Sequence, residues 1–131
     1  MKRSQVLTFL FCFVCLYGTM EAQTRLPKLF IINLNQDSAS FAIPIEANLI
    51  PGDTLQFVAL NGDFDILIRD AYQFLRIVDD DLKLRLVSSG DATSDKYIVR
   101  KITEYKTEYN PYCISSNSWP DAPPKIIIVS Q

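Results

Sequence analysis

The chain has 131 residues, with 13 basic and 15 acidic side chains, no histidine and a formal net charge of −2. The missing imidazole excludes Ser-His-Asp and Cys-His nucleophiles and removes the commonest general base. Mild acidity without a basic cluster argues against a nucleic-acid partner.

Residues 1–22 have the pattern of a secretory signal peptide. Lys2 and Arg3 form a positive start, and the apolar residues 6–17 follow. This apolar run is shorter than the roughly 20 residues that a membrane-spanning helix needs. We therefore expect a secreted or periplasmic protein that is not embedded in a membrane after cleavage.

Cleavage is expected after Ala22, with Gly18 as the competing site. Removing residues 1–22 lowers the 13 basic residues to 11 and the 15 acidic residues to 14, so the remaining net charge is −3. Cys113 then stands alone, and an intramolecular disulfide is impossible. Residues 23–131 are expected to form one domain that depends on packing for its stability.

Short apolar runs separated by turn residues predict strands after residue 23. They are residues 28–34, 40–50, 54–60, 64–69, 82–86, 97–107 and 125–130. Pro44 predicts an edge or a bend within the second run, because proline cannot donate to a ladder. Asn61-Gly62-Asp63 predicts a hairpin between the third and fourth runs. Residues 70–78 predict a single helical turn or an irregular strand, and 125–130 is expected to be buried on both sides.

This pattern predicts an all-β protein. Eight or so short strands with turns every 8–12 residues are typical of an antiparallel Greek-key β-sandwich or barrel. At most one short helix is expected.

Three features resemble the cupredoxin, or blue-copper, family. They are Pro44 within an apolar strand, the Pro51-Gly52-Asp53-Thr54 turn leading into a strand, and Tyr112-Cys113 followed by the last strand, 125–130. The resemblance covers nearly all of residues 23–131 in order and spacing. It implies a cupredoxin-like sandwich in which strand 28–34 shares a sheet with the C-terminal hairpin region. An immunoglobulin-like sandwich is the alternative.

The resemblance does not extend to the copper ligands. A blue-copper site needs two imidazoles beside a cysteine thiolate. The family's first histidine would fall within residues 61–65, the second within 114–118 and the axial methionine within 119–122, and none of these ligands is present. Only Cys113 matches, as a vestigial ligand position, so no cofactor is expected. Cys113 is expected to be a buried, slowly reacting thiol whose pKa is raised by apolar burial. A copper-handling or electron-transfer role through Cys113 is the alternative.

The candidate partner-binding site is the end of the sandwich where the family carries its metal. It contains Asn61, Asp63, Phe64, Asp65, Tyr112, Asn117 and Trp119. Exposed aromatic side chains there would form a binding patch, whereas a Trp119 that caps the core would not. Asp63 and Asp65 are alternatively ligands for a hard cation or solvated turn residues. We expect no enzyme, but an exported binding or scaffolding module for a protein or extracellular ligand; a β-sandwich adhesion module is a further alternative.

Overall fold

The computed structural model describes residues 25–130, and these form an almost entirely β structure. The elements are β1 (Leu29–Asn35), β2 (Ala42–Ile43), β3 (Glu46–Leu49), β4 (Thr54–Asn61), β5 (Asp63–Ile68), the 3₁₀ turn η1 (Ala71–Gln73), β6 (Leu82–Val87), β7 (Tyr97–Ile98), β8 (Glu104–Glu108), β9 (Tyr112–Cys113) and β10 (Lys125–Val129). The expected signal peptide and its cleavage site lie outside the described residues. Within 25–130, no helix is long and apolar enough to cross a membrane.

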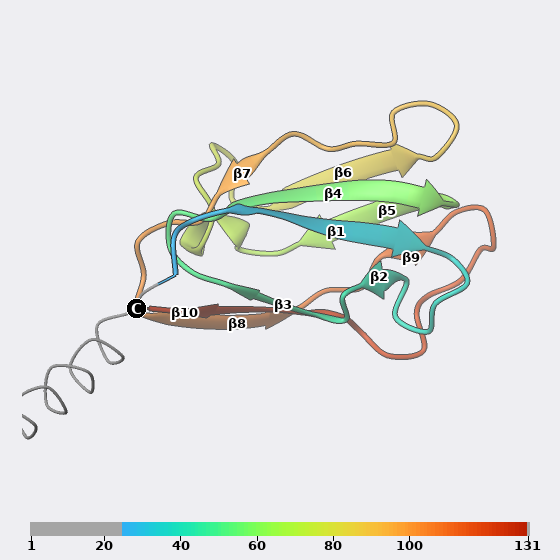
Figure 1. Cartoon of the computed structure of the whole chain (residues 1–131). Helices are drawn as coiled ribbons and strands as arrows, with labels where there is room; N and C mark the ends of the chain where they lie inside the picture. The colour runs from blue at the N-terminus through green and yellow to red at the C-terminus, as the bar shows by residue number, and fades with distance from the viewer. Residues whose placement is uncertain (1–24, 131) are drawn as a thin grey trace, which may run out of the picture.

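The strands form three hydrogen-bonded sheets. Their strand orders are β2-β1-β4-β7, β3-β10-β8 and β6-β5-β9. Figure 1 shows β1 and β4 in one layer, with β3, β10 and β8 across from them in a second. The predicted all-β sandwich with at most one short helix is therefore confirmed.

The core follows from the two-residue period of the strands. In β4 the inward positions are buried and the residues between them are only half buried. The same alternation in the other strands collects side chains from all three sheets into one cluster. Its largest fully buried members are Phe57, Phe64, Phe74, Ile32, Leu34, Leu49, Leu55, Ile68, Leu75, Ile126, Ile128 and Val99.

The sheets are mixed, so the expectation of purely antiparallel strands is wrong for two pairs. β1 runs parallel to β4, and β3 runs parallel to β10. The bend predicted at Pro44 is present, and it separates β2 in the first sheet from β3 in the second. Because the chain changes layer there, β3 meets the C-terminal strand instead of folding back on its neighbour. β1 consequently shares no sheet with β10, contrary to the placement expected for residues 28–34.

The predicted hairpin between residues 54–60 and 64–69 is also absent. β4 pairs with β1 and β7, whereas β5 pairs with β6 and β9. Gly62 lies between β4 and β5 with a φ of 101°, a conformation that suits glycine. The turn residues predict a reversal of the chain correctly, but the strands that follow join different sheets.

Two further expectations are wrong: a single strand over residues 97–107, and burial of residues 125–130 on both sides. Residues 97–107 form two short strands, because the Val99 and Arg100 amides donate to the carbonyls of Asp53 and Phe74 instead of a neighbouring strand. β10 is a central strand, but only alternate residues are buried, since a layer covers one of its faces. The single turn η1 agrees with the prediction for residues 70–78.

Candidate binding groove

A groove opens where two neighbouring strands separate. β8 pairs with β10, but β9, which follows on the same stretch of chain, pairs with β5. The β5–β9 ladder matches Phe64 with Cys113 and Asp65 with Tyr112. The ladder ends there, and β5 and β8 diverge beyond it.

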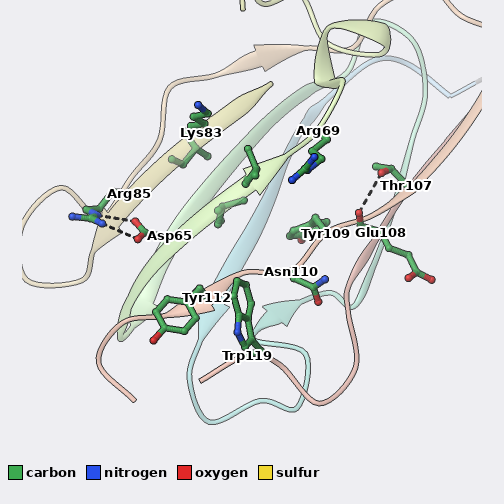
Figure 2. Close-up of a pocket in the computed structure, with 13 residues that line it drawn as sticks. Asp65, Arg69, Lys83, Arg85, Thr107, Glu108, Tyr109, Asn110, Tyr112 and Trp119 are labelled. Carbon is green, nitrogen blue, oxygen red and sulfur yellow. Dashed lines mark hydrogen bonds and ion pairs between the residues drawn. The ribbon is translucent and has the colours of Figure 1, made fainter. Parts of the chain in front are cut away.

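The groove has a volume of about 860 Å³ and draws its walls from three parts of the chain. It is lined by Asp65, Ile66, Leu67, Arg69, Lys83, Leu84, Arg85, Thr107, Glu108, Tyr109, Asn110, Tyr112 and Trp119. Figure 2 shows Tyr112 and Trp119 together at one end, with Arg69 and Lys83 toward the other. An apolar surface with a few charged groups at its margin is typical of a ligand-binding site.

Trp119 and Tyr112 form an exposed aromatic pair at one end of the groove. Their ring centroids are 4.8 Å apart with the planes tilted by 57°, and Trp119 is 63% exposed. The alternative in which Trp119 caps the core therefore does not hold. The Tyr112 hydroxyl is hydrogen-bonded to Asn117, and reciprocal backbone bonds between Cys113 and Ser118 close the intervening loop. The loop thus holds the indole beside the phenol.

Positive charge predominates at the groove. Arg85 donates from Nε and Nη2 to the two carboxylate oxygens of Asp65, at 2.7 and 2.8 Å, and this holds the pKa of Asp65 below its ordinary value. Arg69 and Lys83 make no ion pair within residues 25–130. Glu108 is the other acid of the lining, and its carboxylate lies 3.9 Å from a lysine ammonium outside the groove. The lining therefore carries three cations and two acids.

Tyr109 contributes a buried hydroxyl among the lining residues. Its ring meets Phe57 edge-on at 5.9 Å, and its side chain is 3% exposed. Among the residues described, its hydroxyl is the one buried side-chain oxygen or nitrogen without a hydrogen-bond partner. Burial raises the pKa of Tyr109, so the phenol stays protonated and remains a donor at neutral pH.

Only part of the predicted partner site reaches the groove. Asp65, Tyr112 and Trp119 line it, and Asn117 supports it through Tyr112. Phe64 does not, because the pleat of β5 turns it inward, where it is 0% exposed. Its assignment as a partner-binding residue is wrong.

Asn61 and Asp63 hold loops together at the end of the sandwich. The Asn61 amide donates to Asp37 Oδ2 at 2.9 Å. The Asp63 backbone amide donates to Ser115 Oγ at 3.0 Å, and its carboxylate accepts from the Ser88 amide at 3.2 Å. Neither residue lines the groove. With the Asp65 carboxylate engaged by an arginine, these two acids do not form a shared cation site.

Cys113 is buried, as predicted, with an exposed fraction of 0%. Its surroundings are polar, however: Sγ lies 3.4 Å from Ser115 Oγ and 3.8 Å from Gln36 Oε1. Burial raises the pKa of the thiol, but the hydrogen bonds from Ser115 and Ser116 together lower it by a larger amount, so the net shift is downward. The expected rise in pKa is therefore wrong, because the sequence did not show that these hydroxyls turn back onto the sulfur.

The surroundings of Cys113 do not fit a copper ion. The chain has no imidazole, and the side-chain atoms that hydrogen-bond to the sulfur are hydroxyl and amide oxygens, which are hard donors. Within residues 25–130, no three histidine, cysteine or acidic side chains come close enough to hold a metal ion.

The sequence pattern identified only three of the thirteen lining residues, Asp65, Tyr112 and Trp119. It did not indicate Leu67 on β5, Arg69 just after it, Glu108 at the end of β8 or Asn110 beyond it. No local pattern marks where the β5–β9 ladder stops, because its end depends on which strands pair. The partner strand at that ladder could not be known without the topology.

Comparison with known proteins gives a likeness only among solved structures. No family model and no curated protein matches the chain. The structure is similar to that of a mutant amicyanin in its reduced Cu(I) form at pH 4, with 10% sequence identity and a TM-score of 0.46. The match covers 82% of this chain and 87% of that one.

Proposed function

We propose that this protein is an exported, non-catalytic binding module that holds its partner in the groove between β5 and β8. The observation that carries the proposal is the Tyr112–Trp119 pair, which stands exposed at the end of a groove of about 860 Å³. Tryptophan and tyrosine are enriched among residues that dominate binding energy. The loop holds both rings in place, so little conformational entropy is lost on binding.

The titratable groups of the groove support binding over catalysis. A general acid or base works best when its pKa lies near the operating pH. The pKa of Asp65 is lowered by Arg85 and that of Tyr109 is raised by burial, so both shifts lead away from neutrality. No histidine is available to take either role.

We propose export because residues 1–22 have the pattern of a signal peptide. We propose that the protein binds no cofactor because the donor atoms around Cys113 do not suit copper. The competing copper-handling role has a direct test. Adding Cu(II) to the purified protein should give no intense blue thiolate-to-copper band and should barely move the thermal midpoint, because a ligand specific to the folded state would raise it. A clear rise that Cys113→Ser abolishes would favour the copper role.

The binding role is tested by titrating ¹⁵N-labelled protein with three panels of probes: short extended peptides, oligosaccharides and small organic anions. We expect chemical-shift changes at the groove residues for at least one panel. For its tightest member, Trp119→Ala should weaken binding by roughly 30-fold, the equivalent of a loss of about 2 kcal/mol.

Tyr72→Ala is the matched control, because Tyr72 is an exposed aromatic residue outside the groove lining. It should change the dissociation constant less than about twofold, as expected for a surface residue without a contact. Shift changes that map elsewhere, equal effects of the two variants, or no groove response at millimolar concentrations of every panel would each reject the proposal.

A further inference from the structure

The β5 edge of the groove carries unpaired backbone groups. In an antiparallel sheet, the N–H and C=O of one residue point to the same side, and successive residues alternate. The Asp63 carbonyl accepts from the Ile114 amide at 2.7 Å, so positions 63, 65 and 67 direct these groups away from β6. The β5–β9 ladder ends at Asp65, and the lining residue Leu67 lies beyond it. Its N–H and C=O therefore face the groove.

The opposite wall of the groove is also a free strand edge. The Thr103 carbonyl accepts from the Ser130 amide, and the Tyr109 amide donates to the Pro124 carbonyl, at 2.9 and 3.1 Å. Odd-numbered residues of this segment thus direct their backbone groups toward β10. The backbone groups of Glu108 and Asn110 point the other way, and both residues line the groove. The Glu108 carbonyl accepts a hydrogen bond from the Thr107 hydroxyl at 3.2 Å, but no strand pairs with this edge in the described part of the chain.

Unpaired strand edges favour one class of occupant. A free edge is a template for an extended chain, which supplies one N–H or C=O for each group on offer. Asp65 is already paired with Tyr112, so the free stretch is residues 66–69, which span roughly 13 Å at about 3.3 Å per residue. A saccharide or a small anion would satisfy the backbone donors and acceptors of the two walls less completely.

Charge selects among extended chains. The whole protein is acidic, with a formal net charge of −2, yet the groove lining holds three cations and two acids. One of those acids, Asp65, is already engaged by Arg85. Arg69 and Lys83 have no ion-pair partner in the described part of the chain. An acidic peptide therefore complements this end of the groove, and a basic one is repelled.

We propose that the groove binds an extended acidic segment of a partner protein, about four residues long, which adds as a strand to the free edge of β5. Acidic side chains of the segment meet Arg69 and Lys83, and its other end packs against the Tyr112–Trp119 pair. The proposal rests on the binding role proposed above and names its ligand class.

The probe is the synthetic peptide acetyl-Val-Glu-Val-Glu-Val-amide, titrated into the ¹⁵N-labelled protein. We expect saturable shifts at Leu67 and Asn110, with slower hydrogen exchange of the Leu67 amide once it is paired. A second peptide carries N-methyl groups on alternate amides, which removes donors but keeps composition and charge. It should bind at least tenfold more weakly, and equal affinity would overturn the strand-addition geometry.

Charge is tested with a peptide in which lysine replaces glutamate, and with Arg69→Glu. The lysine peptide should bind the unmodified protein at least tenfold more weakly, and Arg69→Glu should reduce or reverse that preference. Lys96→Glu makes the same charge change on an exposed residue outside the groove lining and should leave the preference intact. An unchanged preference in Arg69→Glu overturns the charge assignment.

The outcomes separate this inference from the binding role itself. If an oligosaccharide or small anion binds in the groove in a Trp119-dependent way while no peptide does, the strand-addition proposal fails and the binding role stands. If no probe perturbs the groove, both fail.

Discussion

Replacing Asp53 by alanine should destabilise the fold strongly, because four hydrogen bonds converge on its carboxylate. Arg25 donates from Nη1 and Nη2 at 2.9 and 2.5 Å. The backbone amides of Lys28 and Ile50 donate at 2.9 and 3.0 Å. The side chain is 0% exposed, so water does not compete for these oxygens. The carboxylate ties the residues before β1 to the turn before β4.

The cost follows from what the substitution leaves behind. Two backbone donors lose their acceptor, at about 1–3 kcal/mol each where no water replaces it. The Arg25 side chain is one-third exposed, so its charge recovers part of its hydration. We expect a loss of about 3 kcal/mol in the free energy of unfolding, toward the low end for a broken buried ion pair. For a domain of this size, that lowers the thermal midpoint by roughly 12–18 °C.

The same carboxylate predicts how stability responds to acid. Burial alone would raise the pKa of Asp53, but the hydrogen bonds from Arg25 and the two amides outweigh it and hold the pKa below its ordinary value. A carboxyl with a lower pKa in the folded than in the unfolded state contributes its full stabilisation above the unfolded pKa of about 3.9. That contribution is lost as the pH falls through the folded pKa.

Urea denaturation followed by Trp119 fluorescence, from pH 7 down to pH 2.5, measures both effects. Asp53→Ala should have lower stability at neutral pH and a flatter acid limb than the unmodified protein. Arg25→Ala keeps the Asp53 carboxylate as acceptor for both backbone amides and should cost less, about 1.5 kcal/mol for the charge-assisted hydrogen bonds. Equal stability of Asp53→Ala and the unmodified protein at pH 7, or parallel acid limbs, would refute this account of the carboxylate.

Four shorter predictions concern the groove and its surroundings. Phe64→Ala should lower the free energy of unfolding by about 3–4 kcal/mol in a urea titration, because it opens a core cavity. Trp119→Ala should cost less than about 1 kcal/mol, and the reverse order would place Trp119 in the core. Cys113 should react slowly with a thiol reagent in the native state and fully in denaturant, since access limits it even though its pKa is lowered. Immediate stoichiometric labelling of the native protein would contradict this. Asp65→Asn should cost less than about 1 kcal/mol, because its pairing with Arg85 is largely exposed, and the difference should shrink in high salt.

The sequence predicted the strands better than it predicted their partners. The alternation of Leu82, Leu84 and Leu86 with two cations places β6 correctly, since burial on one face is a local property. The parallel pairing of β1 with β4 joins segments about 25 residues apart, and no local pattern encodes it. The turn at Gly62 shows the same limit, because a turn signal specifies a reversal and not the sheet that follows.

Only part of the candidate site could be predicted from the sequence, for a related reason. Tyr112 and Trp119 lie close together in the sequence, so their proximity required no knowledge of the topology. The groove beside them depends on the divergence of β5 and β8, which are about 40 residues apart. Phe64 was misplaced by a single position along its strand, because one residue decides which face of a sheet a side chain occupies.

The two faces of β5 have different roles: one packs in the core and the other lines the groove. Phe64, Ile66 and Ile68 alternate into the core and are almost fully buried. Asp65 and Leu67 point the other way and line the groove, followed by Arg69 just beyond the strand. Because the buried side chains of β5 hold the strand in the core, β5 can lack a ladder partner beyond Asp65 without loss of the fold. An unpaired edge is ordinarily a liability for aggregation. Here cationic side chains flank it, so a neutral or basic strand gains little, and the edge remains selective for an acidic partner.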